Sequence, residues 1–248
     1  MLAIVGGSGF TELANLEITR RQVIRTPYGE PSGALTFGCL NGGDVVFLAR
    51  HGYGHTIPPH AVNYRANVWA LHSLNVSGVI AIASVGGIRS DLDPGALVLP
   101  DQIIDYTHSR RSTFFEGPDQ PVSHVDFTHP YSRALQQDCL RAAELAQVPL
   151  MLGGVYGATQ GPRLETAAEI DRLERDGVDM VGMTGMPEAA LAREIGLEYA
   201  SIAVVANFAA GRGTSREGIR LQDLQVTLQA AVGKVKRILG RLVEVHGG

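Results

Sequence analysis

The stretch VVFLARHG, residues 45–52, places five apolar residues directly before two basic side chains, Arg50 and His51. The apolar run is typical of a buried parallel strand. In an open α/β sheet, ligands collect at the carboxyl ends of strands, where an arginine can hold a phosphate or carboxylate through two hydrogen bonds. The stretch therefore predicts an anion site at a strand end, and a strand end that is merely solvated remains the alternative.

Short β-branched runs alternate with segments of helical period along the whole chain. This alternation predicts one α/β domain over residues 1–248, with a mostly parallel sheet covered by helices on both faces. Residues 106–131 keep no clean period and are expected to form a long loop, and long loops are usually functional. We expect strands at 2–5, 44–49, 79–83, 96–104, 155–158, 180–183 and 200–205, and helices at 64–74, 132–146, 165–175, 187–195 and 221–243.

Composition argues against several classes of partner. The net charge of -4, from 21 basic and 25 acidic residues, leaves no excess positive charge to bind a nucleic-acid backbone. Cys39 and Cys139 fit neither a disulfide framework nor a metal motif. The chain starts without a basic leader region and has no apolar run of transmembrane length. We therefore expect a cytoplasmic protein that binds neither nucleic acid nor membranes.

Three further strand ends carry hydroxyl side chains: Ser8, Ser84 and Thr184 each follow a predicted strand. Nearby glycines let backbone N–H groups approach an anion, and Thr184 precedes the start of a predicted helix. The chain lacks the GxxxxGK[ST] loop of triphosphate sites, the third glycine of GxGxxG dinucleotide sites and a carboxylate cluster for magnesium. Together with Arg50 and His51, these residues predict a cradle for free phosphate.

Two other positions could contact an organic substrate. Asn207 is a single polar residue at the end of the apolar strand 200–205, although an asparagine that starts a turn is an alternative. Glu165 follows a Gly-Pro pair, although an acid in the first turn of a helix, favoured by the helix dipole, is also common.

Six separate segments resemble the trimeric purine nucleoside phosphorylase and methylthioadenosine phosphorylase family, in order and spacing, along nearly the whole chain. The resemblance implies a distorted, mostly parallel central sheet flanked by helices and a homotrimer. It also implies no metal and no cofactor, with inorganic phosphate as co-substrate for cleavage of an N-glycosidic bond. The segments are GGSG at 6–9, TPYGEPS at 26–32, ARHG at 49–52 with His55, NYRANVWAL at 63–71, GPR at 161–163, and MT at 183–184 with PE at 187–188.

The resemblance also implies roles for single residues. Met183 lies against the ribose, and His124 matches a histidine that a neighbouring subunit lends to the 5′ end, so that 106–131 serves as a subunit interface. Ala83 stands where the family has Thr or Asn, so one hydroxyl contact is lost or passes to the next residue. The phosphate site falls on Ser8, Arg50, His51, Ser84 and Thr184.

The implied mechanism depends on charge. As the bond to the base lengthens, the sugar becomes positive, and a phosphate dianion held beneath it by Arg50 and His51 stabilises the transition state more than the ground state. Phosphate is then both nucleophile and electrostatic catalyst. The leaving purine gathers negative charge, and Asn207 assists by hydrogen bonding at N7.

The base-reading positions differ from those of the methylthioadenosine enzymes, which carry Asp at the positions of Asn207 and Ala209. The 6-oxopurine enzymes have Asn at the first position and Phe-Glu-Thr where this chain has Leu164, Glu165 and Thr166. Leu164 is then a substrate contact, and Glu165 can accept the N1–H of a 6-oxopurine. Adenine presents a lone pair at N1, so an ionised carboxylate would reject it. The chain thus combines segments that resemble the methylthioadenosine enzymes with base-reading residues that resemble the 6-oxopurine enzymes. This combination implies 5′-methylthioinosine as the nucleoside.

The resemblance leaves alternatives open for the residue that contacts the 5′ group of the nucleoside, for the substrate and for the class of reaction. Leu221 is the best match to the aliphatic residue that replaces a histidine in the methylthio enzymes. Within the same class, a phosphorylase for inosine and guanosine, or for methylthioadenosine, remains possible. A nucleosidase of related fold would use water and should lack the phosphate cradle. A catalytically silent nucleoside-binding protein would release no base.

Overall fold

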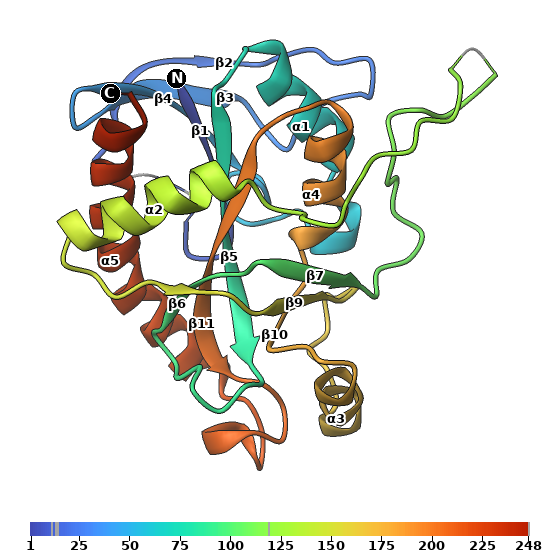
Figure 1. The fold of residues 1–248 in the computed structure, drawn as a ribbon, viewed down its shortest axis with the longest axis vertical. Helices are drawn as coiled ribbons and strands as arrows, with labels where there is room; N and C mark the ends of the chain where they lie inside the picture. Colours follow the sequence, from blue (N-terminus) through green and yellow to red (C-terminus); the bar gives the residue numbers. More distant parts are fainter. Residues whose placement is uncertain (11, 13–14, 119, 248) are drawn as a thin grey trace.

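The computed structural model describes residues 1–10, 12, 15–118 and 120–247, and Figure 1 shows their arrangement. One sheet of eleven strands forms the centre of this described part, and its main path runs β2-β3-β4-β1-β5-β10-β9-β7. The strands are β1 (Leu2–Gly6), β2 (Glu17–Gln22), β3 (Leu35–Leu40), β4 (Gly43–Ala49), β5 (Gly78–Gly87), β6 (Leu97–Leu99), β7 (Gln102–Asp105), β8 (Met151–Leu152), β9 (Val155–Ala158), β10 (Met180–Gly182) and β11 (Tyr199–Phe208).

The central sheet is distorted because it branches at β5. β1 and β11 run parallel to β5 on opposite edges, and β11 also pairs with β6, which pairs with β8. β10 joins β5 in the antiparallel direction, while its other partner, β9, is parallel to it. The expectation of a distorted, mostly parallel sheet flanked by helices is confirmed.

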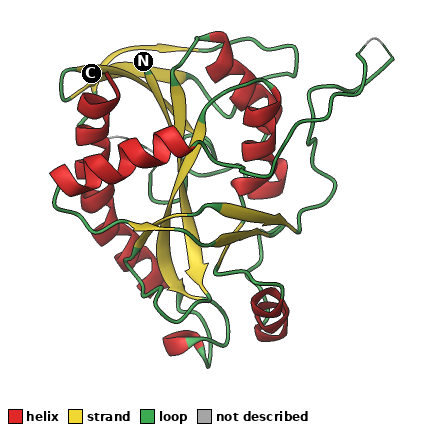
Figure 2. Ribbon diagram, viewed as in Figure 1, coloured by secondary structure: helices red, strands yellow, loops and turns green. Residues whose placement is uncertain are grey.

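Helices cover both faces of the sheet (Figure 2). One buried cluster joins α2 and α5 to the sheet, a second joins α1 and α4 to its other face, and a third, smaller one lies beneath α3. The helices are α1 (Tyr64–Ser73), α2 (Arg133–Leu145), α3 (Ala167–Arg175), α4 (Gly185–Glu194) and α5 (Leu221–Gly247), with short 3₁₀ helices η1 (Pro59–Ala61) and η2 (Gly213–Ser215).

The alternation of side chains along β5 explains the two main clusters. Successive residues of a strand point to opposite faces. Val79, Ala81 and Ala83 therefore pack in the cluster of α1 and α4, whereas Ile80 and Ile82 pack in the cluster of α2 and α5. Because both faces are buried, the strand is apolar from Val79 to Ala83, as the sequence pattern indicated. It continues beyond the expected end to Gly87, so Ser84 lies within the strand rather than after it.

The structure corrects several expected boundaries. The single strand expected at 96–104 is wrong: β6 ends at Leu99, and β7 begins at Gln102 beside a different neighbour, β9. Pro100 lies between them, and proline has no N–H to donate to a ladder. The strands β2, β3 and β8 were not expected from sequence, and every residue of β2 is exposed, so its pairing with β3 has no hydrophobic signal.

Residues 106–131 contain no helix or strand in their described portion, and most of them project from the body of the molecule as an arm (Figure 1). His124 lies on this arm and is exposed. None of the helices that the structure describes is long and apolar enough to cross a membrane.

Candidate functional site

The strand ends meet at a gap in the sheet. β1 pairs with β5 only as far as Ala81, and β10 enters from the opposite direction and reaches β5 at Gly86. Along this edge, residues 82–85 have no strand neighbour in the described sheet. A cavity of about 540 Å³ occupies this place, and nine of the residues expected from sequence line it: Ser8, Arg50, His51, Ser84, Leu164, Glu165, Met183, Thr184 and Asn207.

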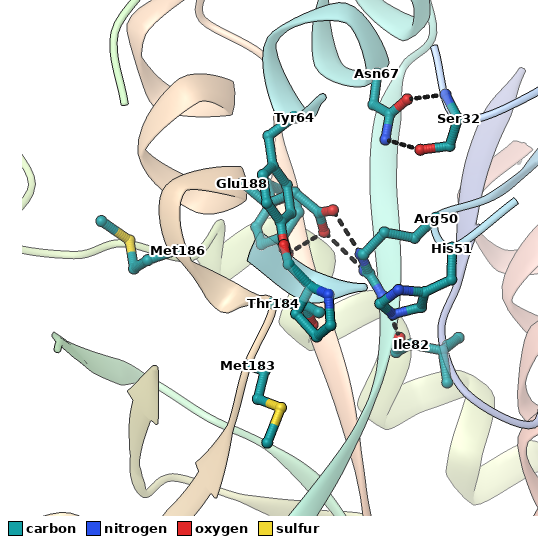
Figure 3. A network of polar contacts seen from close by, with 12 residues as sticks. Ser32, Arg50, His51, Tyr64, Asn67, Ile82, Met183, Thr184, Met186 and Glu188 are labelled. Carbon is teal, nitrogen blue, oxygen red and sulfur yellow. Dashed lines mark hydrogen bonds and ion pairs between the residues drawn. The ribbon is translucent and has the colours of Figure 1, made fainter. Parts of the chain in front are cut away.

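Arg50 is the most unusual side chain of the cavity, because it is only 1% exposed. Its Nε and Nη2 donate to the two carboxylate oxygens of Glu188 at 2.7 and 2.8 Å, and its Nη1 donates to the Ile82 carbonyl at 3.0 Å (Figure 3). Burial lowers the pKa of Arg50, but the charge and hydrogen bonds of Glu188 outweigh this effect and raise it. Arg50 is therefore a buried, permanently charged group in a fixed orientation.

The ion pair leaves part of the guanidinium for a ligand. Arginine has five N–H groups, and these contacts within the described chain use three of them, leaving one on each terminal nitrogen. A phosphate can accept two parallel hydrogen bonds from such a pair. The glycine at position 7 allows this packing, because an added Cβ would lie 2.5 Å from the Ile82 carbonyl oxygen and 3.1 Å from Arg50 Nη1.

His51 is held as a hydrogen-bond acceptor toward the cavity. Its Nδ1 lies 2.8 Å from the Ile57 carbonyl, which can only accept, so Nδ1 carries the proton. Burial and the charge of Arg50 lower the pKa of His51 to about 4. At neutral pH the imidazole is therefore uncharged, and its Nε2 has a lone pair.

The lowered pKa of His51 predicts a pH-dependent stability. Between pH 6.5 and about 4 the unfolded state binds this proton and the folded state does not, so stability is present above pH 6.5 and is lost as the pH falls through this window. Urea unfolding in phosphate-free buffer at several pH values should show a weaker decline for His51→Asn than for wild type. The exposed His60 provides the control, since His60→Asn should keep the wild-type slope. Identical slopes for all three proteins would contradict the prediction.

The base-reading candidates, Asn207 and Glu165, also line the cavity. Asn207 is placed by a bulge, because the pairing of β11 with β5 shifts register between Val205 and Asn207. Its Nδ2 donates to the Phe208 carbonyl at 2.6 Å, which orients the amide. Glu165 accepts a hydrogen bond from Thr159 at 2.6 Å.

The alternative role for Glu165 as a first-turn helix acid is wrong. α3 begins at Ala167, two residues later than expected, and its N-cap is Thr166. The acid of its first turn is Glu169, which completes a capping box with Thr166. Glu165 therefore lies in the loop before the helix, where it lines the cavity.

Two expected contacts do not line this cavity. Leu221 is 64% exposed at the start of α5, and the apolar residues that line the cavity near this helix are Ile219 and Leu224. His124 belongs to the segment 106–131 and is exposed. Met183 is a lining residue, and Gly161 packs against it, since an added Cβ at Gly161 would overlap the Met183 sulfur.

Arg110 helps to hold the loops that line the cavity, and the sequence did not indicate this role. Its guanidinium donates to four carbonyl oxygens, those of Met183, Met186, Thr159 and Gln160, at 2.7–3.2 Å. Arg110 therefore ties the start of the arm to both loops that line the cavity. The adjacent arginine pair at 110–111 was visible in sequence, but carbonyl partners leave no sequence signal. Among the described residues, no group of three or more His, Cys, Asp or Glu could hold a metal ion.

Known proteins resemble this chain over most of its length. A protein of Xanthomonas campestris pv. campestris named "Probable S-methyl-5'-thioinosine phosphorylase" is 52% identical over 241 residues, which cover 97% of this chain and 96% of that protein. The "6-oxopurine nucleoside phosphorylase" of Pyrococcus furiosus is 47% identical over 215 residues, which cover 85% of this chain and 80% of that one.

Solved structures and a family model agree with these relatives. The methylthioadenosine phosphorylase of Schistosoma mansoni in complex with adenine superposes with a TM-score of 0.94 at 33% identity, covering 99% of this chain and 91% of that chain. The family model described as the phosphorylase superfamily matches residues 1–244. With this match, the high identity to curated relatives and the shared fold, the chain belongs to the phosphorylase superfamily.

Proposed function

We propose that the protein cleaves the N-glycosidic bond of 5′-methylthioinosine with phosphate, giving hypoxanthine and 5-methylthioribose 1-phosphate. One observation carries this proposal: a single cavity joins a buried arginine with two available N–H groups to a carboxylate and an amide suited to a 6-oxopurine. The name of the Xanthomonas relative supports the nucleoside, and the name of the Pyrococcus relative supports the base. Inosine or guanosine, and then methylthioadenosine, are the alternative substrates.

Phosphate would bind at the gap in the sheet. Arg50 donates two hydrogen bonds, and the hydroxyls of Ser8, Ser84 and Thr184 line the same cavity. The neutral His51 offers its Nε2 lone pair, which accepts a hydrogen bond from a protonated phosphate oxygen or a sugar hydroxyl. The anion then attacks the sugar carbon as the bond to the base breaks, and its negative charge stabilises the positive sugar.

The base would lie between Glu165 and Asn207. Glu165 accepts the N1–H of hypoxanthine, and Asn207 hydrogen bonds at N7 as the leaving purine gains negative charge. Met183 and Leu164, which line the cavity, would contact the ribose and the base. Ala83 also lines the cavity and adds no hydroxyl there, so that phosphate contact is lost or passes to Ser84, whose hydroxyl donates to the Ser8 carbonyl at 3.2 Å.

The assembly and location are also part of the proposal. His124 is exposed in the segment 106–131, most of which projects from the body of the molecule (Figure 1), and it would reach the 5′ end of a nucleoside in a neighbouring subunit of a homotrimer. We place the enzyme in the cytoplasm, with a nucleoside and phosphate as its small-molecule partners and no cofactor.

Phosphate dependence tests the reaction class. We expect release of hypoxanthine from 5′-methylthioinosine to need inorganic phosphate, because the phosphate is the nucleophile. In buffer freed of phosphate by a scavenging enzyme, the rate should fall by a factor on the order of 100 or more, since both the nucleophile and the negative charge that stabilises the positive sugar are then absent. Equal release without phosphate would indicate a nucleosidase. No release under either condition would indicate a binding protein.

The preference for a 5′-methylthio group over a 5′-hydroxyl group tests the role of the apolar residues that line the cavity. Burying a methylthio group against Ile219 and Leu224 should raise kcat/KM for methylthioinosine over inosine about 10- to 200-fold. Leu224→Ser should narrow this ratio, whereas Leu221→Ser should leave it unchanged because Leu221 is exposed. A wild-type enzyme with comparable kcat/KM for both nucleosides would instead be a general 6-oxopurine phosphorylase.

A further inference from the structure

Glu165 lies between two cavities. Besides the main cavity, it lines a second one of about 590 Å³ on the side of α3. A carboxylate in this position can turn its oxygens toward either space, and only an oxygen that faces the main cavity can meet the base. Thr159, Arg163 and Glu169 also line this second cavity.

Thr159 holds one of the two oxygens. Its Oγ1 donates to Glu165 Oε1 at 2.6 Å, directly after strand β9 ends at Ala158. The backbone of Thr159 is fixed on both sides: its N–H donates to the Gly182 carbonyl at 2.8 Å, and its carbonyl accepts from Arg110 at 3.2 Å. The hydroxyl is therefore presented from a rigid position.

The neighbouring cation does not compete for Glu165. Arg163 lies in the same loop, but its guanidinium is held by Glu169 through two hydrogen bonds of 2.7 and 2.8 Å. Hydrogen bonds to charged groups are stronger than those between neutral groups. The short bond from Thr159 is thus the contact that sets the orientation of the Glu165 carboxylate.

We propose that Thr159 determines base specificity by positioning Glu165, so that Oε1 is occupied and Oε2 remains for the N1–H of a 6-oxopurine. The inference rests on the proposed function, because it takes Glu165 as the residue that reads the base. A 6-aminopurine presents an acceptor at N1, and an oriented carboxylate then faces another lone pair. A carboxylate that is free to turn away would reject this base less strongly and would bind hypoxanthine less tightly.

Affinities of free bases test the inference without any turnover. Calorimetric titration should show that Thr159→Val, which removes the hydroxyl and keeps the shape, weakens hypoxanthine binding by roughly 10-fold, the loss expected for a hydrogen bond to a charged group. Adenine affinity should stay the same or rise. Thr159→Ser should restore the wild-type ratio of hypoxanthine affinity to adenine affinity. Thr107→Val is the matched control, because it removes a 2.7 Å hydroxyl–carboxylate bond to Asp105 outside both cavities.

Three results would overturn the inference. The first is an equal loss of affinity for both bases in Thr159→Val, which would mean a merely structural role. The second is a further change in the ratio when Thr159→Val is added to Glu165→Gln, since the effect should pass through that carboxylate. The third is a wild-type protein that binds adenine as tightly as hypoxanthine. Because binding of a free base needs no phosphate, a failed phosphate requirement would refute the proposed reaction separately.

Discussion

Replacement of Glu188 by glutamine is expected to lower the free energy of unfolding by about 3–5 kcal/mol, because it leaves a buried guanidinium without its counter-charge. Arg50 and Glu188 are 1% and 2% exposed, so water cannot take over the lost contacts. Tyr199, whose hydroxyl donates to Glu188 Oε1 at 2.8 Å, ties the pair to β11. Urea unfolding in phosphate-free buffer gives the measurement.

Phosphate should partly restore the stability of Glu188→Gln. A ligand that binds the folded state stabilises it, and an anion beside Arg50 replaces part of the lost charge. The rise in Tm on adding phosphate should therefore be larger for the variant than for wild type, provided that phosphate binds at Arg50. Glu244→Gln is the control, since its pair with Arg241 is exposed and should contribute less than about 1 kcal/mol. An unchanged unfolding midpoint for Glu188→Gln would contradict the prediction.

Replacement of Asn207 by aspartate is expected to lower kcat/KM for 5′-methylthioinosine by roughly 100-fold or more and to raise the relative use of 5′-methylthioadenosine. A carboxylate accepts a hydrogen bond from the 6-amino group but repels O6. The change also removes the bond from Asn207 Nδ2 to the Phe208 carbonyl, so a second oxygen would face that carbonyl. Initial rates for both nucleosides at saturating phosphate give the ratio of kcat/KM for 5′-methylthioinosine to kcat/KM for 5′-methylthioadenosine.

The Asn207→Asp experiment needs a control for the added charge. Asn75→Asp adds the same charge at an exposed position outside the cavity and should leave the ratio unchanged. Full conversion to the 6-amino substrate is expected only when Glu165 is also replaced. If the wild-type enzyme already prefers methylthioadenosine, the interpretation of both base-reading residues is wrong.

Sequence reasoning located the cavity because its signals are local. An apolar run that ends in Arg50 and His51 defines both a buried strand and the polar group at its end. Ser8 and Thr184 follow the same rule, and ends of neighbouring strands meet in space. The base-side residues Glu165 and Asn207 also line the cavity. Local pattern offered each of them only as a candidate beside a plainer structural alternative, and the family resemblance decided between the two interpretations.

The boundaries of the strands were harder to predict from the sequence, because they depend on which strands pair with one another. Strand β2 exposes every residue, and it exists because β3 offers an edge to which it can bond. The run at 96–104 has a continuous β pattern, but its two halves pair with different strands. Residues far apart in the sequence decide such partners, so local propensity could not predict them.

The sequence by itself determined the alternation of strands and helices and the polar residues at the strand ends, because periodicity and strand termini are local properties. Only the tertiary structure decided which atoms those residues contact. Glu188 neutralises Arg50 from 138 positions away, and Leu224, rather than the nearby Leu221, turns its side chain into the cavity. Orientation within a helix and pairing across the fold depend on packing of the whole chain, which no single stretch of residues encodes.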